Sequence, residues 1–335
     1  MGMMPKDKKN NDLSKRLSII ANVLLTCVLI LAAVGVLTYK KSKDGEIARL
    51  NKLIELTEEN NIIIPVNDFM EYATRYGLMT QFSQRYFPEK HVYVGYHGIE
   101  FSEINESLKT NPLNKEENTF YEEGRLYYQE GAYRSLTGID VSVHQGYIDW
   151  AKVKEDGIDF AYIRVGYRGY SEGKMYIDDY YYSNMRQTAK VGMPVGVYFF
   201  SGAINEKEAI AEADYVLSHI KGYKVDYPIA FDMEDISASN NRMKNLSQDE
   251  KTKIAIAFCQ RINDAGYKTV IYGNAKWLLE SLHYPEIAQY GIWYANWDFY
   301  HWPYELLMHQ YTSSGTVDGI RGRVDMNIGF FNYQE

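Results

Sequence analysis

The hydrophobic pattern divides the chain into one long apolar run near its start and a regular series of short apolar runs after residue 136. The long run, residues 17–39, contains no charged side chain, and its few polar residues are Ser18, Asn22, Thr26 and Thr38. A helix of these 23 residues rises about 1.5 Å per residue and spans a hydrocarbon core of about 30 Å. We predict an uncleaved signal anchor here. A cleaved signal peptide is the alternative, although its apolar region is normally shorter.

Basic residues on either side of this run predict its orientation. Five Lys and Arg residues lie in residues 1–16, and three Lys residues follow the run, at positions 40, 41 and 43. Because the more basic flank usually stays inside the cell, we predict a cytoplasmic tail at 1–16 and a transmembrane anchor at 17–39. The rest of the chain would lie outside the cell, in a single-pass protein of the cell membrane.

The segment 40–135 is predicted to be a stalk or accessory segment. Residues 46–60 place apolar side chains among charged ones at helical spacing. This pattern predicts a short amphipathic helix that either self-associates or lies against the following segment, because two heptads are too few to indicate a coiled coil. Residues 62–135 carry aromatic clusters but no chemical motif, so the sequence is silent on their role.

Short apolar runs rich in β-branched residues recur after residue 136 and alternate at first with helical patterns. The eight predicted strands are Thr137–Val143, Phe160–Tyr167, Pro194–Ser201, Tyr227–Glu234, Lys268–Asn274, Tyr290–Asn296, Leu306–Thr312 and Arg323–Ile328. The predicted helices are Trp150–Glu155, Asp178–Lys190, Glu206–Ile220 and Gln248–Ala265, with N-caps Asn205 and Ser247 and C-cap Gly266. Alternation of this kind is typical of a parallel sheet, and eight strands predict a closed α/β barrel over 136–335. The later connections contain little helix, so we expect an irregular, TIM-like (β/α) barrel.

Two carboxylates stand at the end of the fourth predicted strand, in the sequence Phe231-Asp232-Met233-Glu234. Residues i and i+2 of a strand project from one face, so Asp232 and Glu234 are expected side by side. Two carboxyl groups this close do not both ionise easily, and a proton held at neutral pH suits the acid step of glycoside hydrolysis. For these residues alone, an acidic turn without a chemical role is the alternative.

Two further carboxylates strengthen the prediction of a catalytic pocket. Asp140 lies in the first predicted strand and Asp325 in the last, and these strands become neighbours when a barrel closes. The fourth strand faces them across the mouth, so three strands bring four carboxylates to one pocket. Each carboxylate taken alone has an ordinary structural alternative, such as a turn cap or a salt bridge.

Composition narrows the possible partners. The net charge is −8, and because residues 1–43 sum to +6, the remainder carries −14. An acidic body of this kind lacks the basic footprint of a nucleic-acid-binding protein. The two cysteines, Cys27 and Cys259, do not indicate a disulfide framework, and no zinc or phosphate-binding motif occurs. We predict no nucleic-acid partner, no metal and no cofactor.

Aromatic side chains at the strand ends are candidate sugar contacts, because their rings stack on the apolar faces of sugars. The candidates are Tyr198, Tyr272, Trp293, Tyr294 and Trp297. Membership of the barrel core is the alternative for each of them. Arg164 lies inside the second predicted strand, where it either faces the carboxylates or forms a structural ion pair.

Residues 137–150, which read TGIDVSVHQGYIDW, resemble the opening strand of the glycoside hydrolase family 25 muramidases (lysozymes). The family's Asp-x-Glu strand end is matched by Asp232-Met233-Glu234. Its closing segment is matched by Gln310-Tyr311, by the turn at 319–322, and by Val324-Asp325-Met326-Asn327. The resemblance covers about 136–332, with the motifs in the family's order, and does not include residues 1–135.

This resemblance implies a barrel that cleaves the β-1,4 bond between N-acetylmuramic acid and N-acetylglucosamine in peptidoglycan glycan strands. It implies that Glu234 is the proton donor and later the base, and that Asp232 orients and polarises the substrate's N-acetyl group. Asp140 and Asp325 would shape the charge around them, and Gln310 would join the aromatic candidates and Arg164 in binding substrate. Assistance by the N-acetyl group is the expected route, with covalent and inverting routes left open. A wall-binding barrel without activity and a related hexosaminidase are the alternative functions.

Overall fold

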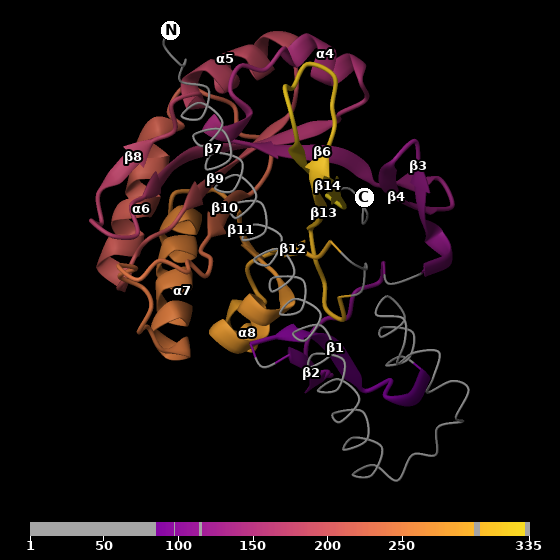
Figure 1. Ribbon diagram of the computed structural model, residues 1–335, viewed down its shortest axis with the longest axis vertical. Helices are drawn as coiled ribbons and strands as arrows, with labels where there is room; N and C mark the ends of the chain where they lie inside the picture. Colours follow the sequence, from indigo (N-terminus) through magenta and orange to yellow (C-terminus); the bar gives the residue numbers. More distant parts are fainter. Residues whose placement is uncertain (1–84, 97, 114–115, 298–301, 332–335) are drawn as a thin grey trace, which may run out of the picture. The chain divides into compact units, whose positions relative to one another are not determined.

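The computed structural model describes residues 85–96, 98–113, 116–297 and 302–331, which all belong to one compact unit, Gly77–Glu335. The main feature of this unit is a closed barrel of eight strands (Figure 1). In chain order these are β6 (Leu136–Val141), β7 (Phe160–Arg168), β9 (Val195–Phe200), β10 (Ile229–Asp232), β11 (Thr269–Gly273), β12 (Ile292–Ala295), β13 (Met308–Gly315) and β14 (Val324–Gly329). Each overlaps a predicted strand, so the predicted barrel is confirmed. A short ninth strand, β8 (Met175–Ile177), pairs with the end of β7.

The prediction of a parallel sheet is wrong for the last strand. Around the ring, each strand from β6 to β13 is parallel to the next, but β14 is antiparallel to both of its neighbours, β13 and β6. Only residues 316–323 connect β13 to β14, which is too short for the crossover that a parallel pair requires. The start of β14, rather than its end, therefore lies at the rim formed by the ends of the other strands.

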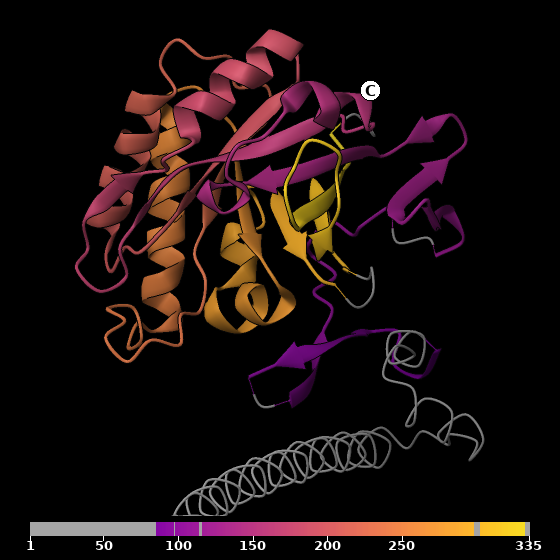
Figure 2. The ribbon, with the colours of Figure 1, turned by 45° about the horizontal axis from the view of Figure 1, so that its top comes forward.

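The four predicted helices are confirmed and follow the first strands of the barrel (Figures 1 and 2). They are α4 (Trp150–Glu155), α5 (Tyr181–Val191), α6 (Glu206–His219) and α7 (Gln248–Asp264). Asn205 and Ser247 cap α6 and α7 as predicted, and Gly266, with φ +89°, directly follows the C-cap residue Ala265. After α7, the described parts of the connections contain only the π-helical turn Trp277–Ser281 and α8 (Tyr284–Ile287) as helices. The second half of the barrel is thus irregular, as expected.

Packed rings fill the barrel interior below its rim. The buried interior side chains are Phe160, Tyr162, Tyr198, Ala230, Val270, Trp293 and Met308. Glycines at the paired positions of the neighbouring strands make room for the rings, because a Cβ at Gly138 would lie 2.1 Å from the Phe160 ring and one at Gly196 would lie 2.5 Å from the Tyr162 ring. The interior is therefore a packed core and not a channel.

Two small sheets precede the barrel and pack on it. The strands β1 (Lys90–Gly95) and β2 (Gly98–Glu103) form an antiparallel hairpin, while β3 (Thr119–Glu122), β4 (Arg125–Glu130) and β5 (Tyr133–Arg134) form a three-stranded sheet. Tyr128 of β4 is buried, with its ring 6.0 Å from that of Phe330. Between the two sheets, Asn111 donates to the carbonyl oxygen of Trp302 at 3.0 Å. The described part of the accessory segment is thus folded onto the barrel.

The predicted tail at 1–16, the anchor at 17–39 and the amphipathic helix at 46–60 lie outside the described residues. Among the residues that are described, no helix is both long and apolar enough to cross a membrane. The anchor, its orientation and self-association through the stalk therefore stay predictions.

Candidate active site

A pocket of about 370 Å³ opens at the rim of the barrel. Its lining residues are Asp140, Ser142, His144, Gln145, Arg164, Tyr198, Phe200, Asp232, Glu234 and Asp325. All four of the predicted carboxylates line this one pocket, although β6, β10 and β14 supply them from distant parts of the sequence.

Asp140 and Asp325 occupy paired positions on the antiparallel strands β6 and β14 that close the barrel. Asp140 is 8% exposed, and its Oδ2 accepts hydrogen bonds from Gln310 Nε2 at 2.9 Å and from Asn327 Nδ2 at 2.8 Å. Burial first, and then the charge of Asp325, raise the pKa of Asp140 to about 8 in spite of these bonds. Burial also raises the pKa of Asp325. This side of the pocket therefore binds a proton at neutral pH.

Asp232 is the last residue of β10, and Glu234 lies two residues beyond it. Asp232 is buried at 6% exposure, and its Oδ1 has no hydrogen-bond partner among the described residues, whereas Glu234 is exposed at the pocket mouth. Burial and the charge of Glu234 raise the pKa of Asp232 well above its usual range. Burial also raises the pKa of Glu234, and a hydrogen bond from Asp232 opposes that rise. The pKa values of both carboxyls are therefore raised, so this pair holds a proton more readily than two separate carboxyls would.

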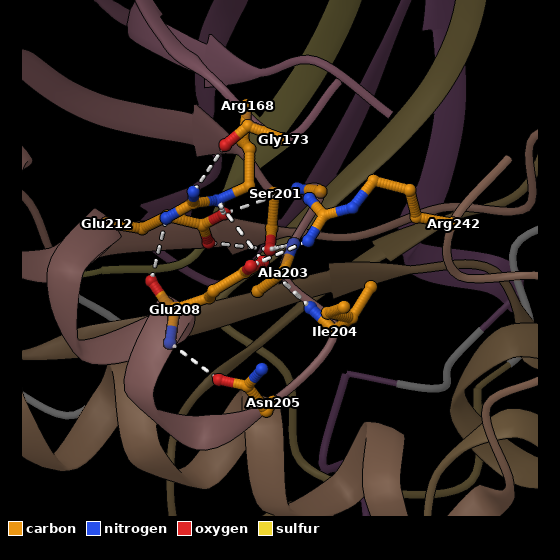
Figure 3. A network of polar contacts seen from close by, with 10 residues as sticks. Arg168, Gly173, Ser201, Ala203, Ile204, Asn205, Glu208, Glu212 and Arg242 are labelled. Atoms are coloured by element: carbon orange, nitrogen blue, oxygen red, sulfur yellow. Dashed lines mark hydrogen bonds and ion pairs between the residues drawn. The ribbon is translucent and has the colours of Figure 1, made fainter. Parts of the chain in front are cut away.

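A buried group of ion pairs, the Arg168–Glu212 network, lies behind the strand ends and consists of Arg168, Ser201, Glu208, Glu212 and Arg242 (Figure 3). Glu212 of α6 is fully buried and accepts from Arg168 Nε at 2.6 Å and from Ser201 Oγ at 2.7 Å. Glu208, one helical turn earlier, pairs with Arg242 Nη2 at 2.6 Å. Burial raises the pKa of Glu212 to about 7, against the effect of its hydrogen bonds.

Ser201 links this network to the pocket. Its hydroxyl donates to Glu212, while its backbone N–H donates to the carbonyl oxygen of Asp232 at 2.7 Å. Ser201 directly follows Phe200, which lines the pocket. The network therefore fixes the backbone from which Asp232 and Glu234 project.

Arg164 lines the pocket, but its charge is shared with a partner outside it. Its Nε and Nη2 lie 2.9 and 2.8 Å from Asp178 Oδ2, which also accepts from the backbone N–H of Val143 at 2.9 Å. The guanidinium opposes the rise in the pKa of Asp232, although burial and the charge of Glu234 outweigh it. Asp178, which the sequence did not single out, thus fixes both Arg164 and the segment that follows β6.

Three of the predicted aromatic contacts lie near the rim, and two of them meet at Gln310. Tyr198 lines the pocket at 9% exposure. The Tyr272 hydroxyl donates to Gln310 Oε1 at 2.9 Å, and the Trp297 Nε1 lies 3.4 Å from the same oxygen. Gln310 thereby connects these rings to Asp140. Trp297 is 59% exposed, so its ring is open to a ligand.

The two other aromatic candidates are buried. Trp293 is 2% exposed in the barrel interior, where its Nε1 donates to Asn327 Oδ1 at 2.8 Å. Tyr294 is 1% exposed, with its ring stacked 4.5 Å from that of Trp302. Trp293 therefore acts from below the pocket by orienting Asn327, a residue to which the sequence assigned no role. The available signal was its position, two residues after Asp325 on the same strand.

The pocket offers acid–base chemistry at carboxyl groups. Its carboxyls hold protons above their usual pH range, and Glu234 is open to solvent, where a ligand can reach it. Carboxyl groups whose environments drive their pKa values apart provide the acid and base of glycoside hydrolysis. Among residues 85–331, so far as they are described, no group of three or more His, Cys, Asp or Glu is arranged to hold a metal ion. That the site needs no metal or cofactor stays a prediction.

An irregular barrel with this carboxyl pocket at its rim defines a glycoside hydrolase. The chain belongs to the glycosyl hydrolases family 25, whose family model matches residues 139–320. The match runs from within β6 to the connection after β13, and it leaves out β14, the β1–β2 hairpin and the β3–β5 sheet.

Relatives and solved structures agree with this assignment. The chain is 30% identical to lysozyme M1 of Streptomyces globisporus over 57% of its own length and 67% of that protein, and 25% identical to the autolytic lysozyme of Clostridium acetobutylicum over 57% and 55%. It is similar to the modular autolysin LytC of Streptococcus pneumoniae, solved in complex with a synthetic peptidoglycan ligand, with 27% identity, a TM-score of 0.55 and coverage of 72% and 56%. A family 25 glycosyl hydrolase of Bacillus anthracis, 22% identical with a TM-score of 0.51 over 62% and 94%, shares the fold. The chain thus spans little more than half of two of these proteins.

Proposed function

We propose that this protein is a muramidase that hydrolyses the β-1,4 bond between N-acetylmuramic acid and N-acetylglucosamine in peptidoglycan. The observation that carries the proposal is one pocket that holds four carboxyls with raised pKa values, of which Glu234 is open to solvent. The names of the relatives, lysozymes and an autolysin bound to a peptidoglycan ligand, support the choice of substrate.

Glu234 is the proposed general acid. It is exposed at the mouth, so its proton can pass to the glycosidic oxygen as the bond from that oxygen to the anomeric carbon breaks. Asp232 is too buried to reach that oxygen, but its unpartnered Oδ1 is suited to accept the N–H of the 2-acetamido group. The acetamido oxygen then bonds to the anomeric carbon. Water displaces it in a second step and gives its proton to the Glu234 carboxylate, so the configuration is retained.

Asp140 and Asp325 complete the proposed mechanism by facing the positive charge that develops at the anomeric carbon. The proton that Asp140 holds limits the total negative charge of the pocket. The anomer first formed distinguishes an inverting route from the two retaining routes. The effect of replacing the N-acetyl group with a free amine then distinguishes substrate assistance from a covalent route. Only the assisted route is lost with that replacement.

Release of muropeptides from purified peptidoglycan tests the proposal. Full-length wild type is compared with Glu234→Gln and with Glu286→Gln, a control at an exposed carboxylate of α8. Loss of a general acid lowers the rate on the order of 10²–10⁴-fold, and the control leaves it unchanged. Equal release by wild type and Glu234→Gln contradicts the role of Glu234. Binding of peptidoglycan without any release favours an inactive wall-binding barrel, and new reducing ends on N-acetylglucosamine favour a hexosaminidase.

We also propose that residues 17–39 anchor the protein in the cell membrane with the barrel outside. The uncharged run of 23 residues and the more basic flank before it support this topology. Protease added to intact protoplasts should remove the barrel and leave the tail at 1–16 protected. Recovery of the full-length chain from the culture medium, or protection of the barrel, would contradict it.

A further inference from the structure

The β1–β2 hairpin, which lies outside the family match, reaches the segment that carries Glu234. At the tip of the hairpin, the Tyr96 hydroxyl donates to Asp235 Oδ2 at 2.5 Å. Asp235 directly follows Glu234, and its Oδ2 also pairs with Lys276 Nζ at 3.1 Å. We propose that Tyr96 is a positioning residue for Glu234, acting through Asp235. This inference rests on the proposed function, in which Glu234 is the general acid.

Glu234 needs such support because no strand holds it. β10 ends at Asp232, and residues 233–238 belong to neither helix nor strand. Before Glu234 the backbone is fixed at Asp232 by the N–H of Ser201, and after it by Asn241 Nδ2, which donates to the carbonyl oxygen of Ile236 at 3.0 Å. Asp235 lies between these two fixed points, and Tyr96 and Lys276 hold its side chain.

The tip of the hairpin is itself held from several sides. Ser281, which is buried, lies 2.7 Å from the Tyr96 hydroxyl and can donate to it while that hydroxyl donates to Asp235. The backbone N–H of Tyr96 donates to Glu280 Oε2 at 3.3 Å, and Lys276 Nζ lies 4.3 Å from the centre of the Tyr96 ring. Tyr96 therefore contributes to an ordered set of charged contacts, although its side chain is 45% exposed.

The hairpin thus supplies the barrel with a contact that the family-matched residues 139–320 do not contain. A small displacement of a catalytic group, even one caused by a distant residue, lowers the rate of the chemical step far more than it lowers substrate binding. Loss of the Tyr96 hydroxyl should therefore affect kcat rather than KM.

The test uses the full-length chain and a soluble tetrasaccharide of alternating N-acetylglucosamine and N-acetylmuramic acid. Tyr96→Phe removes only the hydroxyl and should lower kcat on the order of 10-fold with KM within about twofold of wild type. Tyr121→Phe is the matched control, because Tyr121 is 65% exposed on β3, and it should leave both constants unchanged. Asp235→Asn should lower kcat as well, and the double variant should be no slower than Asp235→Asn alone, because both changes break one path.

A second measurement does not depend on activity. Amide hydrogen exchange across residues 233–238 should accelerate at least about threefold in Tyr96→Phe relative to Tyr121→Phe. Wild-type kcat in Tyr96→Phe, multiplicative effects of Tyr96→Phe and Asp235→Asn, or unchanged exchange would each overturn the positioning role. If the wild-type chain cleaves no oligosaccharide, the proposed function fails, and the exchange measurement still decides whether Tyr96 orders this segment.

Discussion

The carboxylate pocket and the Arg168–Glu212 network contain the same kind of buried acid in different surroundings. In the network, Glu208 and Glu212 each lie 2.6 Å from an arginine nitrogen. In the pocket, four carboxyls share a lining in which the guanidinium of Arg164 is bonded to Asp178. One cluster is neutralised by its own partners, and the other can relieve its repulsion only by binding protons.

This difference separates a structural from a chemical role better than a raised pKa does. Burial raises the pKa of Glu212 to about 7 and that of Asp140 to about 8, so the two values alone do not distinguish the sites. The partners do. A buried acid that keeps its arginine holds the structure together, whereas acids held close without matched cations reduce stability and gain proton affinity.

The largest effect is expected where the network loses its cation. Arg168→Met leaves Glu212 buried without its ion pair and should lower the free energy of unfolding by about 3–5 kcal/mol. Urea denaturation measures this. Arg186→Met, at an exposed position of α5, is the control and should change stability by less than about 0.5 kcal/mol. A loss of less than about 1 kcal/mol in Arg168→Met would mean that the network contributes no more to stability than surface ion pairs do.

The next largest effect is expected in the pocket, where loss of a carboxyl should lower the rate but not the stability. Asp232→Asn removes the buried carboxyl beside Glu234 and should lower the rate of peptidoglycan cleavage on the order of 10²–10³-fold. The free energy of unfolding should stay constant or rise, because like-charge repulsion is relieved. Rate assays and denaturation of the same preparation check both halves. A variant that loses activity and stability together would contradict the contrast.

The difference in stability between Asp140→Asn and wild type should depend on pH. Between the unfolded pKa, about 3.9, and the folded pKa of about 8, the folded protein binds more protons at Asp140 than the unfolded chain does. The contribution of Asp140 to the free energy of unfolding is therefore fully present below the pKa of the unfolded chain. It is lost as the pH rises through the pKa of the folded protein. The stability of Asp140→Asn relative to wild type should thus rise with pH, by about 1 kcal/mol between pH 6 and 7. A difference that does not depend on pH would contradict the raised pKa.

The smallest effect is expected at the residue shared by both regions. Ser201→Ala removes the hydroxyl that donates to Glu212 but keeps the backbone N–H that donates to Asp232. Stability should fall by about 1 kcal/mol, with a rate within about twofold of wild type. If the rate instead falls as far as in Asp232→Asn, the network belongs to the chemistry of the site and not only to its support.

Strand positions and the pocket carboxylates were predictable because both leave strong local signals. Buried strands appear as continuous apolar runs, and Asp232 and Glu234 stand two residues apart where such a run ends. Strand direction leaves no such signal. The reversal of β14 follows from the length of the connection 316–323, and the hydrophobic pattern of the strand is the same in either direction.

Other residues escaped prediction because their roles depend on partners distant in sequence. Trp293 occupies a strand position that fits either the rim or the interior, and only the closed barrel assigns it to the interior. Glu212 lies on the buried stripe of α6 with Ala209, Ala213 and Val216, so its position on the helix gave a readable signal of burial. No signal in the sequence indicated the role of Tyr96, because its partners Asp235 and Ser281 lie more than a hundred residues away along the chain.

The reversed last strand also determines where the first and last residues of the barrel lie relative to the pocket. Gly329, at the end of β14, pairs with Leu136, at the start of β6, so the first and last residues of the barrel lie together at the floor, opposite the pocket. A linker joining these two positions, with new termini opened in an exposed surface loop, should give a circular permutant that keeps the four pocket carboxylates but lacks the contact from Tyr96. A module fused after the last strand would likewise emerge beneath the barrel and leave the path of a glycan strand across the rim unobstructed.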